Sequence, residues 1–390
     1  MSCKPDNEHF GGTTMSAKKP VIVYGASGYT GRLVCEYLRE YNIPFIAAGR
    51  SAEKLNAAMK ANVAGIETAD YEVVEVPHTV SALTELFNGA SVVLNTVGPF
   101  ARFGAEVVQA CWASRCHYTD TTGEQDWLIT LEQEWGTKFA NAGLLLAPGI
   151  AQMYTTGEIA AQLCLETPGL DTLDIAVFWG GSPTIASTQT ILVNAAMAKA
   201  YYLEQNKYVE HQVDAGLYNL AIPGQHELAL ALPWGGTSHP VWFKRDPRVA
   251  NVKVLGGVFN RALMLGVPQI VAAALDATKD MNPDDRYAAL AQTAAGVMNT
   301  MPPRENPRVN KSLDSVHASG PLGRAHCVIN GNSNYKQTGM LQAYAAAHLL
   351  QQPPKRVGFA SGCQAFGHHE LLGQLRSFGL VSKPILTVHD

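Results

Sequence analysis

Three glycines at regular spacing could hold a phosphate group. Gly25, Gly28 and Gly31 follow the apolar run "VIVY" and open a stretch whose apolar residues have helical spacing. In that context the first glycine permits a tight turn, the second lets the backbone approach a pyrophosphate, and the third allows close helix–strand packing. The loop "GASGYTG" supplies three further candidate contacts, Ser27, Tyr29 and Thr30. The competing interpretation is a glycine-rich turn without a ligand.

An arginine stands where a dinucleotide-binding domain usually has an acid. Arg50 ends the second apolar run, "FIAAG", about 20 residues beyond the glycine loop. A guanidinium can bind a ribose 2′-phosphate through two charge-assisted hydrogen bonds, whereas a carboxylate would repel it. Ser51 can cap the next helix, and Lys54 adds a second cation. The pattern favours NADP(H) over NAD(H); ordinary surface cations beside a helix cap are the alternative.

A nicotinamide enzyme also needs a proton donor from the protein. The candidates that follow the expected fifth and sixth strands are Tyr118, Asp120, Glu124 and Tyr154. For Asp120 and Glu124 the competing interpretation is a loop hydrogen bond and a helix N-cap, and a core position explains Tyr118 equally well. Lys336 is the lysine that could reach an interdomain cleft, with a solvated lysine at a helix start as the alternative.

Metal and thioester chemistry are not expected. Cys116 and His117 are adjacent, so on a strand they point to opposite faces and cannot easily share a ligand site. A thioester enzyme needs a thiolate at a helix N-terminus in mid-chain. Cys164 is expected inside a helix, Cys327 inside a strand, and Cys363 lies close to the C-terminus.

The elements that must position these residues begin with an alternating pattern. Over residues 19–148, short apolar runs such as "VIVYG", "FIAAG", "YEVVEV", "SVVLNTVG", "HYTDTT" and "GLLLAP" alternate with amphipathic stretches. Such alternation predicts β-α-β units and a parallel sheet with helices on both faces. The fold class is therefore α/β, a doubly wound Rossmann sheet of six strands, whose ligands bind at the carboxyl edge.

The rhythm changes after Pro148. We predict a helix over residues 154–165, a strand at "LDIAVFWGG", a helix over 188–204, strand-like pieces at "PVWFK" and "VKVLGGVF", and a hairpin around residues 320–323. The predicted divisions are a disordered leader at 1–18, with Met15 a candidate start, a nucleotide-binding domain at 19–150, an inserted α+β substrate domain at 151–335, and helices at 336–390 that return to the first domain.

Composition limits the partners. The chain has 390 residues, a net charge of -4 and only 16% charged residues, so no basic field attracts a nucleic acid or an anionic membrane. Seven cysteines without a CxxC pair, and an N-terminus without an apolar core, predict a reduced cytoplasmic protein. Residues 261–277 are apolar but too short to span a bilayer, which favours a buried helix over a membrane-surface one. We expect a small-molecule substrate and possible homodimerisation through the second domain.

The chain resembles the saccharopine dehydrogenase-like oxidoreductases. "GASGYTG", "GRS", "NTVGPF", "AC" and "HYTDTTGE" occur in the order and at about the spacing of that family. The resemblance implies an NADP-linked Rossmann domain, an inserted mixed-sheet domain and an active site between them. It also implies that five residues line the nicotinamide side: Thr96, Val97, Gly98, Pro99 and Phe100. Where relatives have "GFDSVPSD"-like and "SGGT" turns, this chain has "APGIAQMYTTGE" and "GGSPT", so the resemblance does not carry over the substrate.

Three functional hypotheses follow. The leading one is an NADPH-dependent reductase acting on a C=N or conjugated C=C bond of a rather apolar metabolite. The second is an NADP-binding redox sensor without catalysis, which the size of the inserted domain disfavours. The third is a membrane-surface lipid reductase with residues 261–277 lying in the interface.

Overall fold

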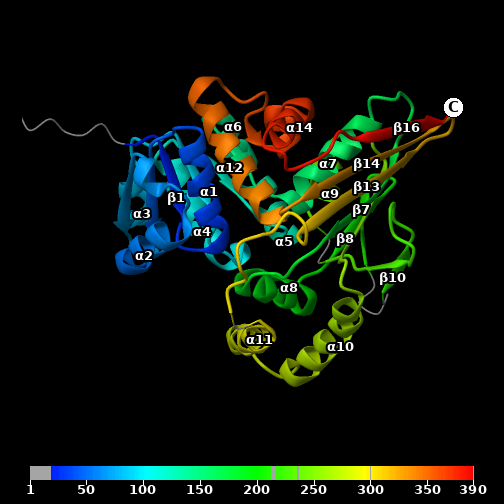
Figure 1. The fold of residues 1–390 in the computed structure, drawn as a ribbon, viewed down its shortest axis with the longest axis horizontal. Helices are drawn as coiled ribbons and strands as arrows, with labels where there is room; N and C mark the ends of the chain where they lie inside the picture. The colour runs from blue at the N-terminus through cyan, green and yellow to red at the C-terminus, as the bar shows by residue number, and fades with distance from the viewer. Residues whose placement is uncertain (1–18, 212–216, 235–236, 299, 390) are drawn as a thin grey trace, which may run out of the picture.

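The computed structural model describes residues 19–211, 217–234, 237–298 and 300–389. Two seven-stranded sheets organise the chain, one at each side of the view in Figure 1. The expected leader, residues 1–18, lies outside the described residues.

The first sheet is parallel throughout, with strand order β15-β6-β5-β4-β1-β2-β3. Its strands are β1 (Val21–Tyr24), β2 (Phe45–Gly49), β3 (Tyr71–Glu75), β4 (Val92–Asn95), β5 (His117–Asp120), β6 (Leu145–Ala147) and β15 (Gly358–Phe359). The order reverses at β1, between β2 and β4, which is the switch point where doubly wound folds bind ligands. The predicted α/β Rossmann fold is confirmed.

Helices cover both faces of this sheet. They are α1 (Tyr29–Glu40), α2 (Ala52–Asn62), α3 (Val80–Phe87), α4 (Phe100–Ala113), α5 (Gln125–Thr130) and α6 (Gly136–Asn141), with a 3-10 turn at Ile66–Thr68 and a π turn at Leu131–Trp135. Strands β1, β2 and β4 are fully buried and, apart from Asn95 at the end of β4, consist of apolar residues, tyrosine and glycine. Their alternate side chains enter two separate cores, one on each face of the sheet.

The second sheet is mixed, with strand order β16-β14-β13-β7-β12-β8-β9. Its strands are β7 (Thr172–Trp179), β8 (Tyr201–Glu204), β9 (Lys207–Glu210), β12 (Asn251–Val258), β13 (Lys311–Ser319), β14 (Arg324–Asn332) and β16 (Ile385–His389). A two-stranded ribbon, β10 (Tyr218–Leu220) and β11 (Ala229–Ala231), lies beside it. The predicted hairpin is present, because β13 and β14 pair in antiparallel register from Lys311↔Asn332 to Ser319↔Arg324.

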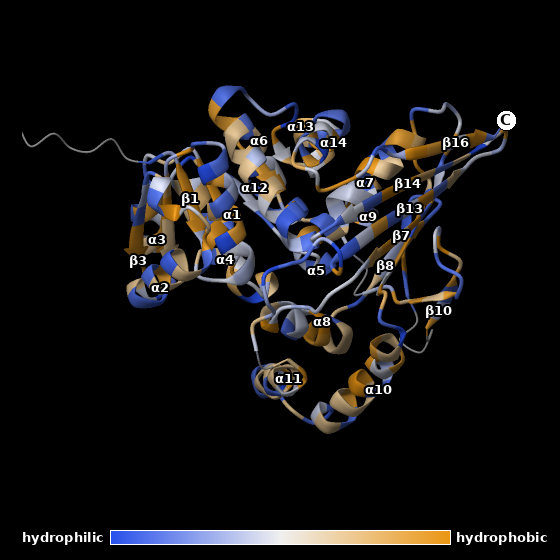
Figure 2. Cartoon of the chain, in the orientation of Figure 1, coloured by the Kyte–Doolittle hydropathy of each residue, from blue (hydrophilic) through white to orange (hydrophobic). Residues whose placement is uncertain are grey.

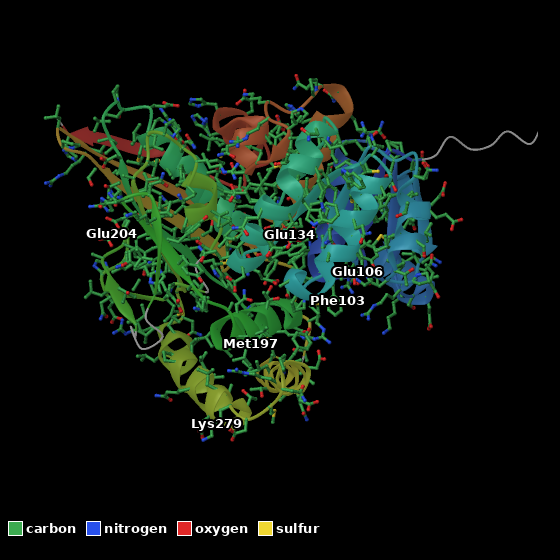
Figure 3. All side chains as sticks on the ribbon, turned by 180° about the vertical axis from the view of Figure 1, so that it is seen from behind. Phe103, Glu106, Glu134, Met197, Glu204 and Lys279 are labelled. Carbon is green, nitrogen blue, oxygen red and sulfur yellow. The ribbon has the colours of Figure 1, made fainter. Side chains whose placement is uncertain are left out.

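The helices of the second half are α7 (Gln152–Cys164), α8 (Ile185–Met197), α9 (His239–Phe243), α10 (Arg261–Thr278) and α11 (Pro283–Val297). Helix α7 packs on the second sheet, and α8 contacts both α10 and α11. Seen from behind in Figure 3, α8 ends at Met197 above the α10–α11 pair, whose connection is marked by Lys279.

The last part of the chain contributes to both sheets. Helix α12 (Asn334–Gln351) packs against α1, and β15 extends the first sheet beside β6. Helices α13 (Gly362–Phe366) and α14 (His368–Ser377) pack on α7, and β16 then pairs with β14 at the edge of the second sheet. In Figure 1 the orange helix α12 lies between the two sheets.

Three local predictions are corrected. "PVWFK" was expected as a strand, but it lies in the short helix α9, where Pro240 occupies the first turn. The helix expected over 188–204 ends at Met197, and its last residues form β8. The helix expected to be buried, α10, has only Met264, Ala274 and Thr278 buried, and in Figure 2 much of its ribbon has the colours of hydrophobic residues. No helix in the described part of the chain is long and apolar enough to cross a membrane.

Candidate active site

The glycine loop leaves room beside the start of α1. Gly25 has φ +92°, and a Cβ there would lie 2.7 Å from Oγ1 of Thr96. A Cβ on Gly31 would lie 2.4 Å from the carbonyl oxygen of Gly25, so helix and strand approach too closely for any side chain. Beside Gly28 only that same carbonyl oxygen lies within 4 Å, at 3.3 Å. No described side chain caps α1, so its N-terminus can bind an anion.

A cation follows the end of β2, and an unexpected acid lies beside it at the end of β3. Arg50 is exposed directly after β2, and the hydroxyl of Ser51 accepts a 3.3 Å hydrogen bond from the N–H of Lys54. The N–H of Ala52 donates a 2.7 Å hydrogen bond to a carboxylate oxygen of Glu75, which ends β3. Sequence reasoning missed Glu75; its signal was that it ends the neighbouring parallel strand, paired with Gly49.

The turn after β4 is fixed by its own side chains. The amide of Asn95 accepts a 3.0 Å hydrogen bond from the N–H of Val97 and donates one of 3.1 Å to the hydroxyl of Tyr118. The hydroxyl of Thr96 donates to the carbonyl of Tyr24 at 3.0 Å. These bonds hold the "NTVGPF" turn against the glycine loop, because Tyr24 immediately precedes Gly25.

A cavity of about 370 Å³ joins the two loops to α7, α8 and the start of α12. Of the residues proposed from sequence, eight line it: Gly28, Tyr29, Thr30, Gly31, Thr96, Gly98, Phe100 and Tyr154. Of the other proposed residues, Val97 packs beside Gly25 and Pro99 is the N-cap residue of α4. None of the described residues that line this cavity carries a charged side chain.

Tyr118 and Asp120 belong to a buried network next to the cavity. The hydroxyl of Tyr118 donates a 2.7 Å hydrogen bond to Asp120, whose other oxygen accepts from the N–H groups of Thr122 and Gly149 at 2.9 and 2.8 Å. Burial raises the pKa of Asp120 to about 6, against the lowering effect of these hydrogen bonds. Both side chains are fully buried and lie outside the cavity lining, so their contacts tie the loops after β5 and β6 together.

Glu124 caps a helix that is distant in sequence. Its two carboxylate oxygens accept hydrogen bonds of 2.7 Å from the N–H groups of Phe100 and Ala101, at the start of α4. A carboxylate there is stabilised by the helix dipole. Burial nevertheless raises the pKa of Glu124 to about 7, because the side chain is only 3% exposed.

Tyr154 is the one proposed proton carrier that reaches the cavity. Its side chain is partly buried in the first turn of α7, and nothing in the described chain hydrogen-bonds to its hydroxyl. A Cβ on Gly123 would lie 1.7 Å from that hydroxyl oxygen. Burial, reinforced by the nearby Glu124, raises the pKa of Tyr154 above its usual range, so the hydroxyl stays protonated and can donate to a ligand.

His239 supports Tyr154 and was not found from sequence. It is fully buried, its Nε2 lies 2.8 Å from the backbone oxygen of Tyr154, and the two rings meet edge to face at 6.5 Å. Burial lowers the pKa of His239 to about 4, so the ring is neutral and donates from Nε2 to that carbonyl. The one available signal was Pro240, which marks the start of α9.

The start of α12 supplies further polar groups. The hydroxyl of Tyr335 donates to Ser187 at 2.9 Å and accepts from the N–H of Thr184 at 3.0 Å, which joins α12 to the start of α8. Oε1 of Gln152 and Oδ1 of Asn334 are buried without a partner among the described residues, and both residues line the cavity. Two unsatisfied acceptors suit a ligand that brings N–H or O–H donors, such as a carboxamide.

Lys336 points elsewhere. Its backbone N–H and Nζ donate to Glu305, at 2.8 Å to a carboxylate oxygen and 3.2 Å to the carbonyl. Lys336 is absent from the described lining of the cavity.

Residues 155–390 match the family described as "Family of unknown function (DUF5938)". The chain belongs to this family. Residues 21–142 of this DUF5938 chain match a second family, the saccharopine dehydrogenase NADP binding domain. The resemblance inferred from "GASGYTG", "NTVGPF" and "HYTDTTGE" is therefore confirmed over residues 21–142.

The curated relatives share only the first part of the chain. A Caenorhabditis elegans "Lipid droplet localized protein" is 33% identical over 132 residues, 32% of this chain and 31% of that protein. A human "Saccharopine dehydrogenase-like oxidoreductase" is 32% identical over 139 residues, 32% of each chain. A "Trans-acting enoyl reductase" of Mycobacterium ulcerans is 36% identical over 107 residues, 27% of this chain and 25% of that protein. The chain thus spans about a third or less of these relatives' lengths.

A solved structure shares the whole fold. The apo saccharopine dehydrogenase (L-Glu forming) of Saccharomyces cerevisiae covers 95% of this chain and 100% of its own length, with a TM-score of 0.56 and 13% identity. At this identity the likeness concerns the arrangement of the two sheets and their helices.

Proposed function

We propose that this chain is an NADPH-dependent reductase that adds a hydride and a proton across a C=N or conjugated C=C bond of an apolar metabolite. The observation that carries the proposal is one shared cavity. Gly28, which has an open side, and Tyr154, whose hydroxyl has no described partner, both line the same cavity of about 370 Å³.

The residues present fit a dinucleotide. Gly28 and the N-terminus of α1 would hold the pyrophosphate, and Thr96, Gly98 and Phe100 would line the nicotinamide side. The unsatisfied oxygens of Gln152 and Asn334 would accept hydrogen bonds from ligand N–H or O–H groups. When bound, the reduced cofactor supplies the hydride and leaves oxidised by two electrons.

Tyr154 would act on the substrate atom that receives the electron pair. As the hydride reaches the electron-poor carbon, the electron pair of the C=C or C=N bond moves to the substrate's oxygen or nitrogen. The Tyr154 hydroxyl, kept protonated by its raised pKa, would donate its hydrogen bond to that atom and stabilise the charge. The same hydroxyl would then transfer its proton to that atom and regain one from solvent, so each turnover consumes one cofactor hydride and one solvent proton.

The choice of NADP(H) rests on Arg50 and Lys54, both exposed beside the end of β2. Glu75 opposes it, since its carboxylate occupies the N–H of Ala52 at the start of α2. A 2′-phosphate would have to displace Glu75 or share the site with it.

The absence of charged side chains from the described lining supports an uncharged substrate. An enzyme that binds a dicarboxylic amino acid needs cations for its carboxylates, and the described lining of this cavity holds none. The name of the mycobacterial relative, an enoyl reductase, agrees with a conjugated C=C bond as the target.

We also propose a compartment and an oligomeric state for the protein. Five described cysteines are free and buried, which supports a reducing compartment such as the cytoplasm: Cys35, Cys111, Cys164, Cys327 and Cys363. Strand β16 leaves Ile385, Leu386 and Val388 exposed at 59%, 42% and 44% on an edge strand, which supports a homodimer through the second sheet. The oligomeric mass in solution, with and without an Ile385→Lys substitution, tests this.

The enzymatic proposal is tested by single-turnover oxidation of NADPH against 2-alkenals, enoyl thioesters and cyclic imines. Oxidation by at least one class is expected, and Tyr154→Phe should slow it about 100-fold while the NADPH Kd stays within about twofold. Tyr71→Phe, a partly exposed tyrosine of β3 outside the cavity, is the matched control. Tight NADPH binding without oxidation by any class would favour the redox-sensor hypothesis instead.

A further inference from the structure

We propose that the substrate carries an unbranched apolar chain, and that the end of this chain lies in a second chamber between α8, α10 and the end of β12. The inference rests on the proposed reductase function and specifies which class of substrate it uses. It begins from a cavity that the reaction itself does not need.

The chamber is small and apolar. It encloses about 70 Å³ and includes Val258 of β12 with Met264, Val267 and Ile270 of α10. The single hydroxyl-bearing residue in its described lining is Thr188, whose hydroxyl donates to the carbonyl of Thr184 at 2.9 Å. No described lining residue is charged. A narrow space of this chemistry accepts methylene groups and rejects phosphate or carboxylate groups.

The chamber meets the candidate active site at two side chains. Trp179, at the end of β7, and Ile191, in the middle of α8, line both the chamber and the larger cavity. Trp179 is 3% exposed, so its ring belongs to the interior. A chain that leaves the reacting group near Tyr154 and passes Trp179 and Ile191 would enter the chamber directly.

The chamber also explains why α10 is apolar without being buried. One side of the helix lines the chamber through Val267 and Ile270, while Leu265 on another side is 50% exposed. Val297 at the end of α11 lines the chamber and is 44% exposed, so the chamber opens to the surface there. A chain longer than the chamber can leave at this opening.

The experiment measures binding without turnover. The fluorescent fatty acid cis-parinaric acid is titrated into the NADP⁺-bound protein and displaced by straight-chain alcohols of six to twelve carbons. In the wild type, each added methylene should strengthen displacement about threefold until the chain fills the chamber. An affinity that does not change with chain length would overturn the proposal.

Substitutions then show where the apolar chain of the alcohol binds. Val267→Trp fills the chamber and should weaken binding of the longest alcohol at least tenfold, while that of hexanol stays within about twofold. Leu265→Trp, on the same helix but outside the chamber, should change neither. Val297→Trp, at the exposed opening, is a second blocking variant that the fold should tolerate. Equal losses with Leu265→Trp would assign binding to the outer surface of α10 and overturn the chamber.

Turnover separates this proposal from the one it rests on. Alcohol binding that depends on chain length, without NADPH oxidation by any 2-alkenal, would refute the reductase and retain the chamber. Reduction of hexenal and dodecenal by NADPH with the same KM would retain the reductase and refute the chamber.

Discussion

The hydroxyl of Tyr154 occupies the space that a side chain at position 123 would need. A Cβ on Gly123 would lie 1.7 Å from the hydroxyl oxygen and 2.2 Å from the ring carbon that carries it. Gly123 follows β5 and Tyr154 follows β6. The segments after these two neighbouring strands can therefore approach this closely only because position 123 has no side chain.

Gly123→Ala should therefore displace the Tyr154 side chain and impair its role in the reaction. We expect the single-turnover rate to fall to about that of Tyr154→Phe, and the double variant to be no slower than either single one. Gly373→Ala in α14, where a Cβ meets nothing within 4 Å, is the control and should leave the rate unchanged. Additive losses in the double variant would show that Gly123 acts independently of Tyr154.

Glu75→Gln should increase the preference for NADPH over NADH. The substitution keeps an oxygen for the N–H of Ala52 but removes a negative charge from the place where a 2′-phosphate would bind. We expect the NADPH Kd to fall about threefold to tenfold at low salt and the NADH Kd to stay constant. Arg50→Ala should have the opposite effect. Glu72→Gln, on the same strand, is the control, and an equal gain there would indicate only a change in overall charge.

Asp314→Asn should remove part of the pH dependence of stability. Asp314 is 1% exposed, one of its oxygens has no described partner, and burial raises its pKa from 3.8 to about 7. The neutral form is favoured in the fold, so this contribution is complete below about pH 3.8 and is lost as the pH rises through 7. At pH 8 the variant should gain roughly 1–4 kcal/mol in the free energy of unfolding, with little gain at pH 4.

Urea unfolding at the two pH values measures the difference. The exposed Asp174 of β7 provides the matched Asp→Asn control, which should show no such pH-dependent gain. The same gain at pH 4 and pH 8 would mean that burial does not raise the pKa of Asp314.

Tyr335→Phe should loosen α8 over the cavity. The variant loses the hydrogen bonds to Ser187 and to the N–H of Thr184, which connect α12 with the first turn of α8. Because α8 carries part of the cavity wall but not the proton donor, we expect KM for the substrate to rise about fivefold to tenfold with kcat within twofold. A fall in kcat alone would place Tyr335 among the reacting groups.

The sequence allowed prediction of what is local. The glycine loop, the parallel strands and the β13–β14 hairpin depend on short patterns, and all three are present in the fold. Strand β15 has only two residues and pairs with β6 across the whole second half of the chain, so no local pattern could predict it.

The site was harder to predict because its contacts cross between elements. From sequence, Glu124 was a candidate proton carrier or a helix N-cap, and the N–H groups that its carboxylate binds belong to α4, whose first residue is Phe100. Glu75 accepts a hydrogen bond from Ala52, and His239 bonds to the backbone oxygen of Tyr154. Both pairs are far apart in sequence and meet only in the folded chain. The prediction that α10 is buried was wrong for another reason. An apolar helix that lines a chamber on one side has the same composition as a buried helix.

The contribution of β15 to the first sheet has a consequence for synthesis on the ribosome. Strands β1 to β6 are complete once Ala147 has emerged, but the outer edge of β6 stays open until Gly358 and Phe359 follow. During that interval the sheet exposes unpaired N–H and C=O groups, and α1 lacks its partner α12. The nascent chain is therefore most vulnerable to aggregation while its second sheet is being translated, and a chaperone that binds it then would protect β6 and α1.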